Sequence, residues 1–175
     1  MIRLGFKFHL ILGIVKKLLI ALALMVPAFL MSYSPEQPSE AQVSMEAPEV
    51  AIANGDSTVS LNSLRGKYVV LNFWSKNEPS SRIDNHFYGR SVAMAADPDI
   101  VYISICTDSS DEQLSQMLVA EDGNNPSTQY YRSQLAGQDN SQAYTREGLA
   151  TWLISPQGVI IAKNPGYDAV ALLKG

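Results

Sequence analysis

The sequence predicts an α/β domain in which a central mixed β-sheet carries helices on both faces and follows an N-terminal β-hairpin. Two runs rich in β-branched and aromatic residues, 67–75 and 100–107, have the composition of buried strands. A helix-length segment separates them, so we expect two parallel strands joined by a right-handed crossover. A hairpin pattern over 151–164 adds antiparallel strands and makes the sheet mixed.

A hairpin is predicted before the first buried strand. Asn54-Gly55-Asp56 separates two short β-rich segments, 50–53 and 58–61. Asn-Gly supplies the positive φ angles that a tight turn requires. A short helical turn is expected to follow and to end at Gly66, because glycine commonly closes a helical turn.

Two helices are predicted, one after each buried strand. Pro79 opens the first, which runs to about residue 95, and Asp108-Ser109-Ser110 caps the second, which runs over 111–121. Apolar residues at helical spacing predict the buried faces. These residues are Ile83, Phe87 and Met94 in the first helix, and Leu114, Met117 and Leu118 in the second.

The C-terminal third is predicted to complete the sheet. Residues 128–132 form an edge strand within a polar, Gly- and Asn-rich stretch. The segments 151–155 and 159–164 flank the turn Pro156-Gln157-Gly158 and form the closing hairpin. A short helix over 167–174 ends the domain.

The first residues have the pattern of a targeting segment. Lys16-Lys17 precedes 14 apolar residues, which suits a secretory signal and is short for a membrane span of ~20 residues. The preceding stretch FHLILGIV is also apolar, so residues 1–31 are either a signal peptide or an uncleaved N-terminal anchor. Residues 32–46, rich in Ser, Pro and Glu, are predicted to be a flexible linker, and 47–175 the folded domain. Both alternatives predict an exported protein, periplasmic or tethered to the membrane on its non-cytoplasmic side.

Charge and cysteine content exclude several functions. Without the four cations of residues 1–31, the chain has nine basic and 17 acidic side chains, a net charge of −8. This part of the chain lacks the clustered Lys and Arg residues that contacts to nucleic-acid phosphates need, so no nucleic-acid partner is expected. A single Cys excludes an intrachain disulfide, a cysteine-based zinc site and a dithiol cycle within one chain. We predict no cofactor and no metal.

Two segments carry a resemblance to a known family. APEVAIANGDSTVSLNSLRGKYVVLNFWS and TWLISPQGVIIAKN resemble the opening and the tail of exported thioredoxin-like proteins of the TlpA/ResA and AhpC/TSA type. Together they span roughly residues 47–164 and preserve the order of the elements. The resemblance implies a thioredoxin-like fold, and a thiol–disulfide oxidoreductase or antioxidant activity at the start of the first helix.

The residues that carry this activity in the family are replaced here. When FWSKNEPSSR is aligned with the family pattern, Glu78 and Ser81 occupy the two cysteine positions and Asn77 the position of the preceding Trp. Ala150 stands where the family has a cis-proline. Thiol–disulfide exchange needs an attacking thiolate and a resolving thiol, which a carboxylate and a hydroxyl cannot replace. The sequence therefore predicts a redox-inactive motif, and a peroxiredoxin activity is excluded for the same reason.

Two residues near this motif have alternative interpretations. We interpret Asn77 as the helix N-cap and Glu78 as a carboxylate that the helix dipole stabilises; the alternative is that Glu78 acts as an acid or base. Cys106, at the end of the second buried strand, is expected on the same side of the sheet as the Glu78 loop. It is interpreted as a small buried hydrophobe, and the alternative is a reactive thiol.

The remaining candidate groups have structural interpretations. Ser81, Asp84 and His86 could be imagined as a hydrolytic set, but no nucleophile elbow accompanies them. An acidic cluster is interpreted as helix capping rather than a cation site, because it lacks the spacing of a calcium loop. Its members are Asp108, Asp111 and Glu112. Aromatic residues in and beside the later strands are interpreted as core rather than a binding surface. They are Tyr130, Tyr131, Tyr144 and Trp152.

The function predicted from the sequence is that of a non-catalytic binding or accessory module with a protein partner in the cell envelope. Only the N-terminal segment is expected to touch the membrane. One alternative is a thiol–disulfide oxidoreductase or antioxidant protein of the TlpA/AhpC-TSA type that uses Cys106 with an external thiol. The other is a purely structural partner, held beside an envelope complex by its tether.

Overall fold

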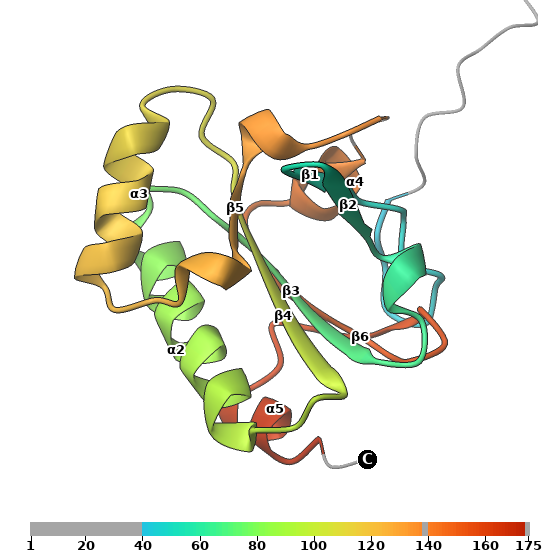
Figure 1. The fold of residues 1–175 in the computed structure, drawn as a ribbon. Coiled ribbons are helices and arrows are strands. Elements are labelled where there is room, and N and C mark those ends of the chain that lie inside the picture. The colour runs from blue at the N-terminus through green and yellow to red at the C-terminus, as the bar shows by residue number, and fades with distance from the viewer. Residues whose placement is uncertain (1–39, 138–139, 174–175) are drawn as a thin grey trace, which may run out of the picture. The chain divides into compact units, whose positions relative to one another are not determined.

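A computed structural model describes residues 40–137 and 140–173 of the chain (Figure 1). The predicted targeting segment, 1–31, and the first part of the predicted linker lie outside the described residues. Among the helices that are described, none is both long enough and apolar enough to cross a bilayer.

The mixed sheet and the N-terminal hairpin are confirmed. The hairpin pairs β1 (Ala51–Asn54) with β2 (Ser57–Ser60). The five-stranded sheet has the order β5-β4-β3-β6-β7. Its strands are β3 (Tyr68–Trp74), β4 (Ile100–Cys106), β5 (Gln129–Tyr131), β6 (Thr151–Ile154) and β7 (Ile160–Lys163). β3, β4 and β5 are parallel, whereas β6 and β7 run antiparallel to their neighbours.

The turn of the hairpin differs in one detail from the expectation. Asn54 belongs to β1, where it pairs with Ser57, and only Gly55 of the predicted turn residues has a positive φ, +60°. Glycine adopts such an angle without the steric cost that a Cβ brings. The tight connection therefore depends on Gly55 alone.

Helices cover both faces of the sheet (Figure 1). Helix α2 (Pro79–Ala95) and α5 (Tyr167–Ala171) pack on one face around Val70 and Leu153. The hairpin and α4 (Ser141–Thr145) cover the other face. Helix α3 (Glu112–Glu121) contributes Val119 to a small cluster at the end of β4. Three short 3₁₀ turns complete the fold: η1 (Asn62–Leu64), η2 (Pro126–Thr128) and η3 (Arg132–Gln134). The sequence analysis did not predict α4.

The predicted buried face of α2 is wrong. Ile83, Phe87 and Met94 are 54%, 44% and 73% exposed, and the residues that α2 buries are Ser81, Asn85 and Tyr88. The same reversal occurs in α3, where Leu114 and Met117 are exposed while Ser115 and Val119 are buried. On α2, Asn85 faces the sheet and hydrogen-bonds to side chains of β4 and β5, and on α3 the buried Ser115 lies beside Cys106 at the end of β4. The spacing of apolar residues in the sequence alone could not predict which face of each helix is buried.

The folded body begins earlier than the predicted boundary at residue 47. The Ala41 side chain lies in the core, and its N–H donates to the Ala143 carbonyl at 3.0 Å. The Ser44 N–H donates to the Ile160 carbonyl at 2.7 Å, beside β7. The described residues 40–46 of the predicted linker are therefore part of the domain, because their backbone groups find partners along the sheet edge.

Candidate functional site at the carboxyl ends of β3 and β4

The motif positions lie together at the carboxyl end of β3. Glu78 is exposed just before α2, and Ser81 is buried in its first turn. Ala150 is buried immediately before β6, and its carbonyl accepts the Phe73 N–H at 3.1 Å, which places it beside the end of β3. The structure thus brings together the elements that the resemblance predicts for the motif, but with a carboxylate, a hydroxyl and an alanine.

The Ser81 hydroxyl ties the loop to the helix. Its Oγ donates to the Glu78 carbonyl at 2.8 Å and accepts the Ser75 N–H at 3.1 Å. The side chain therefore satisfies backbone groups at both ends of the loop 75–78, which connects β3 to α2. A group engaged in this way stabilises the loop and is not free to react.

The Asp108 carboxylate, just beyond β4, holds the same loop from the other side. It accepts the Lys76 N–H at 2.7 Å, the Ser75 Oγ–H at 2.9 Å and the Asn77 Nδ2–H at 3.3 Å. Partial burial by itself would raise the pKa of Asp108, but these hydrogen bonds, one from Cys106 and the Lys76 charge together lower it. The Lys76 ammonium also donates to the Ser110 carbonyl. The carboxyl ends of β3 and β4 are thus joined through one ionised group.

The starts of the two helices correct two predicted caps, those at Asn77 and Asp108. Residue Glu78, not Asn77, is the N-cap of α2, and no side-chain hydrogen bond caps that helix. Asn77 reaches Asp108 instead. Asp108 does not cap α3, because Asp111 does so by accepting the Leu114 N–H at 3.3 Å. Position Asp111 was correctly placed in the sequence analysis near the helix start, whereas Asp108 is recruited by the neighbouring loop.

The acidic cluster does not converge on one point. Asp108 faces the loop, Asp111 caps α3, and Glu112 accepts hydrogen bonds from Gln116 and Ser133. Within 40–137 and 140–173, no three His, Cys, Asp or Glu side chains are grouped as a metal site would require.

Cys106 lies beside the loop but is not accessible. It is 1% exposed, and it ends β4 in register with Trp74 at the end of β3. Its Sγ–H donates to Asp108 at 3.3 Å, and the Ser115 hydroxyl lies 3.5 Å from the same sulfur. Burial raises the pKa of the thiol, which keeps the thiolate fraction low. The predicted proximity to the loop is confirmed, and the environment is that of a small buried side chain.

The imagined hydrolytic set is not assembled. Ser81 faces the loop, and Asp84 accepts the Tyr167 hydroxyl at 2.6 Å. The His86 ring lies edge-on to Phe87 on the outer surface of α2.

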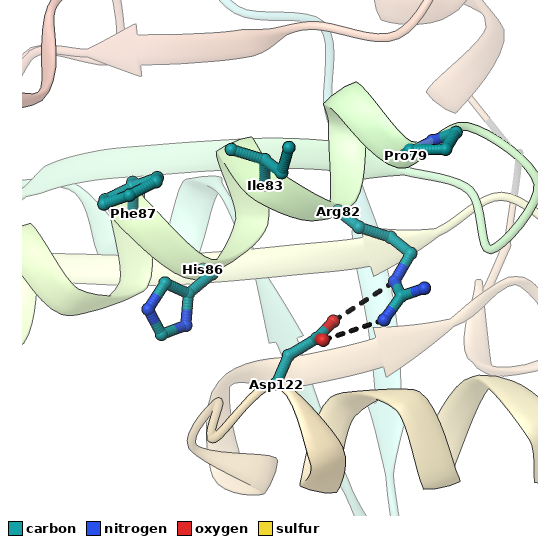
Figure 2. Close-up of a pocket in the computed structure, with 6 residues that line it drawn as sticks. All are labelled: Pro79, Arg82, Ile83, His86, Phe87 and Asp122. Atoms are coloured by element: carbon teal, nitrogen blue, oxygen red, sulfur yellow. Dashed lines mark hydrogen bonds and ion pairs between the residues drawn. The ribbon is translucent and has the colours of Figure 1, made fainter.

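His86 lines a surface pocket of about 430 Å³ along α2 (Figure 2). Arg82 and Asp122 close one side of this pocket with two hydrogen bonds, at 3.2 Å and 2.7 Å. Figure 2 shows Ile83 and Phe87 on the far side of the helix from that ion pair. Of the side chains that the structure describes, no Ser, Thr, Cys or Lys lines this pocket.

The aromatic residues have mainly structural positions. Tyr144 and Trp152 are buried, and Tyr144 packs against Phe73 and Trp152 with ring centroids at 5.5 Å and 5.7 Å. Their interpretation as core is confirmed. Tyr130 and Tyr131 are half-buried in and beside the edge strand β5.

A buried polar network behind the site was missed by the sequence analysis. It runs from β6 through β3 and β4 to α2 and β5, and its members are Thr151, Asn72, Ser104, Asn85, Tyr102 and Gln129. The Asn85 side chain is its centre: Oδ1 accepts from the Ser104 and Tyr102 hydroxyls at 2.7 Å and 2.8 Å. The sequence does contain a signal for this network, because each of the two buried strands carries one polar residue, Asn72 and Ser104. A buried polar side chain needs a hydrogen-bond partner, so such residues indicate further polar groups nearby.

Comparison with known proteins places the fold. No protein-family model and no curated protein matches the chain significantly. Among solved structures, a thioredoxin-like protein from Parabacteroides distasonis is 27% identical, with a TM-score of 0.57, and the match covers 75% of this chain and 96% of that one. A thiol:disulfide interchange protein from Bacteroides sp. is 22% identical, with a TM-score of 0.58 and coverages of 74% and 86%.

A third similar structure is the thioredoxin domain of a thiol-disulfide oxidoreductase from Bacteroides vulgatus. It is 21% identical, with a TM-score of 0.57, and the match covers 75% of this chain and 94% of that one. At this level of identity the last two structures support a shared fold and nothing finer.

Proposed function

This chain is a member of the thioredoxin-like superfamily, as its TlpA-type resemblance implied, and on that premise we propose that it is a non-catalytic binding or accessory module of the cell envelope. It has kept the fold of a thiol–disulfide oxidoreductase without the two thiols. The location in the envelope rests on the targeting pattern of residues 1–31 and on the family resemblance.

The observation that carries this proposal is the state of the motif loop. The positions of the two thiols hold Glu78 and Ser81, and Ser81 is engaged with the loop backbone. The only thiol, that of Cys106, is buried and has a raised pKa. Exchange chemistry needs an accessible thiolate and a second thiol to resolve the mixed disulfide, so the loop supports recognition better than turnover.

The loop offers a surface for a protein partner. Four consecutive residues, 77–80, are exposed to solvent. Asp108 and Ser81 hydrogen-bond to the backbone of this segment and of the residue before it. A preorganised loop loses little conformational freedom on binding, which favours affinity. We therefore assign partner capture to this surface.

Alkylation of Cys106 tests the absence of thiol chemistry. The purified protein is treated with a small thiol reagent, native and in urea, over a pH series. We expect labelling only after unfolding. A control with the thiol moved to an exposed position of α2 (Cys106→Ala with Ile83→Cys) should label in the native state. Fast native labelling of Cys106 with an apparent pKa well below ~8.5 would instead favour the oxidoreductase alternative.

Charge reversal tests the binding surface. We expect Glu78→Lys to weaken capture of envelope proteins at a modest cost in unfolding free energy of about 1 kcal/mol, because the exposed side chain makes no cap hydrogen bond and loses only its interaction with the helix dipole. Glu121→Lys, at the far end of α3, is the matched control. If both variants and the unmodified protein captured envelope proteins equally well, the loop would not be part of the interface. The purely structural role would then be the better account of the protein's function.

A further inference from the structure

The outer edge of β4 is only partly covered. β5 pairs with Ser104, Ile105 and Cys106, the last residues of β4. Within the part of the chain that is described, no strand lies beside residues 100–103 on this side. Proteins usually cover or disrupt such an edge, since its backbone groups can pair with another chain.

The alternation of the strand shows which backbone groups face outward. At one end of β4 the Asp99 carbonyl accepts the Tyr68 N–H at 2.8 Å, and at the other end the Thr107 N–H donates to the Trp74 carbonyl at 2.9 Å. The backbone N–H and C=O groups of odd-numbered residues of β4 therefore point toward β3. Even-numbered positions therefore turn to the open edge. There, the Tyr102 N–H and C=O have no hydrogen-bond partner among the described residues, in contrast to the Ile100 N–H, which donates to Asp97.

A groove of about 580 Å³ follows this edge. Its floor is β4, one wall is α2 at Gly89, Arg90 and Ala93, and the other is the turn that follows α3. Val59 of β2 also lines it, from the opposite face of the sheet. A groove that straddles a sheet edge has the shape that an added strand needs, because successive side chains of a strand point to opposite faces.

The charge of the groove differs from that of the domain. Arg90 and His86 line it and no carboxylate does, although the chain after residue 31 has a net charge of −8. Arg90 is exposed and has no ion-pair partner in the described residues. The amide Nδ2 of Asn124, a lining residue that is 9% exposed, also lacks a hydrogen-bond partner there.

We propose that the groove along β4 binds an extended acidic peptide segment of another protein, which adds to the sheet as a strand beside residues 100–103. The Tyr102 backbone supplies main-chain hydrogen bonds, and Arg90 pairs with an acidic side chain of the peptide. The site is at the amino-terminal half of β4, whereas Cys106 and the motif loop are at its carboxyl end (Figure 1). It is therefore independent of the binding surface proposed above.

The test uses three synthetic peptides on the isotope-labelled protein. They are acetyl-Val-Glu-Val-Glu-Val-amide, its lysine counterpart acetyl-Val-Lys-Val-Lys-Val-amide, and acetyl-Val-Glu-Pro-Glu-Val-amide. We expect the acidic peptide alone to shift the Tyr102 amide resonance in a saturable way and to slow its hydrogen exchange. Proline removes the central main-chain donor, so the third peptide should bind more weakly in the register that turns this residue toward Tyr102. Saturable binding of the acidic peptide that leaves hydrogen exchange at the Tyr102 amide unslowed would overturn strand addition.

Two variants separate charge recognition from misfolding. Arg90→Glu should weaken the acidic peptide by about tenfold or more and favour the lysine peptide, because the reversed charge selects the opposite partner. Arg146→Glu, an exposed residue at the end of α4, should leave both affinities unchanged. An undisturbed Tyr102 amide with all three peptides, or concentration-dependent self-association at this edge without peptide, would reject the proposal. Neither result affects the loop, which the Glu78→Lys capture experiment tests separately.

Discussion

The carboxylate of Asp108 accepts the backbone N–H of Lys76 at 2.7 Å and so joins the end of β4 to the start of the motif loop. The two residues follow neighbouring parallel strands, whose carboxyl ends meet at the same edge of the sheet. An ionised carboxylate holds the loop here, in a fold whose solved relatives include thiol:disulfide interchange proteins. The relationship explains why the loop is ordered without a disulfide.

Loss of this carboxylate should destabilise the protein. We expect Asp108→Asn to lower the free energy of unfolding by about 1–3 kcal/mol, because the partly buried Lys76 N–H and Ser75 hydroxyl lose a charged acceptor. Asp111→Asn is the matched control and should cost under about 0.5 kcal/mol, since Asn and Asp are similar N-caps. Urea unfolding measures both.

The contribution of Asp108 should also depend on pH. Its folded-state pKa is lowered, so the stability it provides is present above the unfolded value of ~3.9 and is lost as the pH falls through the folded pKa. The stability difference between the unmodified protein and Asp108→Asn should therefore shrink in acid. A difference that stays constant well below pH ~4 would show that the ionised carboxylate is not what stabilises the loop.

The orientation of α2 predicts an unusual mutational pattern. Asn85→Ala removes the centre of the buried network and should cost about 2–4 kcal/mol, because the Ser104 and Tyr102 hydroxyls lose their acceptor. Ile83→Ala, on the exposed side of the same helix, should cost no more than about 0.5–1 kcal/mol. If Ile83→Ala were the more damaging change, the helix would have to bury its apolar face after all.

The protein should lose stability in alkali through its buried tyrosines. Burial, aided by the Asp84 charge, raises the pKa of Tyr88 to about 12, and its hydroxyl donates to the Pro165 carbonyl. A group whose folded pKa is raised contributes stability below its unfolded pKa of ~10, and that stability is lost as the pH rises toward 12. Burial also raises the pKa values of Tyr102 and Tyr144.

Replacement of one tyrosine isolates its share of this effect. Tyr88→Phe should make the unfolding free energy fall less steeply between pH ~10 and 12, while Tyr68→Phe, at the half-buried start of β3, serves as the control. Chemical unfolding over a pH series measures both slopes. Identical slopes for Tyr88→Phe and the unmodified protein would contradict the assignment.

Restoring two cysteines should restore thiol chemistry. In Glu78→Cys with Ser81→Cys, the thiols stand at the start of α2, three residues apart, a separation that a helix brings within disulfide reach. We expect an intrachain disulfide on oxidation and a thiol at position 78 whose pKa lies below ~8.5, because the helix N-terminus favours the thiolate. Thiol titration and insulin reduction measure the two properties.

The single variant Glu78→Cys is the control for this experiment, because it lacks a resolving thiol and should show no turnover. Failure of the double variant to form the disulfide would mean that the loop held by Asp108 no longer permits the motif geometry of the family.

The strands were predictable because their signal is local. In the segment 67–75, β-branched and aromatic residues dominate, and the buried central strand β3 lies within one residue of that range at each end. The motif positions Glu78, Ser81 and Ala150 were likewise found from spacing and resemblance alone. Their convergence at one end of the sheet depends on the pairing of β6 antiparallel to β3, which places Ala150, just before β6, beside the end of β3 that leads to Glu78 and Ser81.

The partners of individual polar groups could not be predicted in this way. Asp108 resembles a helix cap in sequence, and its assignment to the loop depends on residues 32 positions earlier. Asn85 stands between Asp84 and His86 in sequence, and its burial depends on hydroxyls that β4 places opposite it. Likewise, the edge at Tyr102 is unpaired because β5 runs parallel to β4 and begins only at Gln129, opposite Ser104.

Local composition and spacing thus determined the strands, the helices other than α4 and their order, and composition the solitary thiol, whereas the replaced dithiol positions followed from the family resemblance. Tertiary structure alone decided which face of α2 is buried, which carboxylate holds the loop and where the sheet edge stays open. The physical reason is that backbone propensity acts between near neighbours in sequence, whereas a buried polar group is stable only beside a partner that the fold brings from elsewhere in the chain.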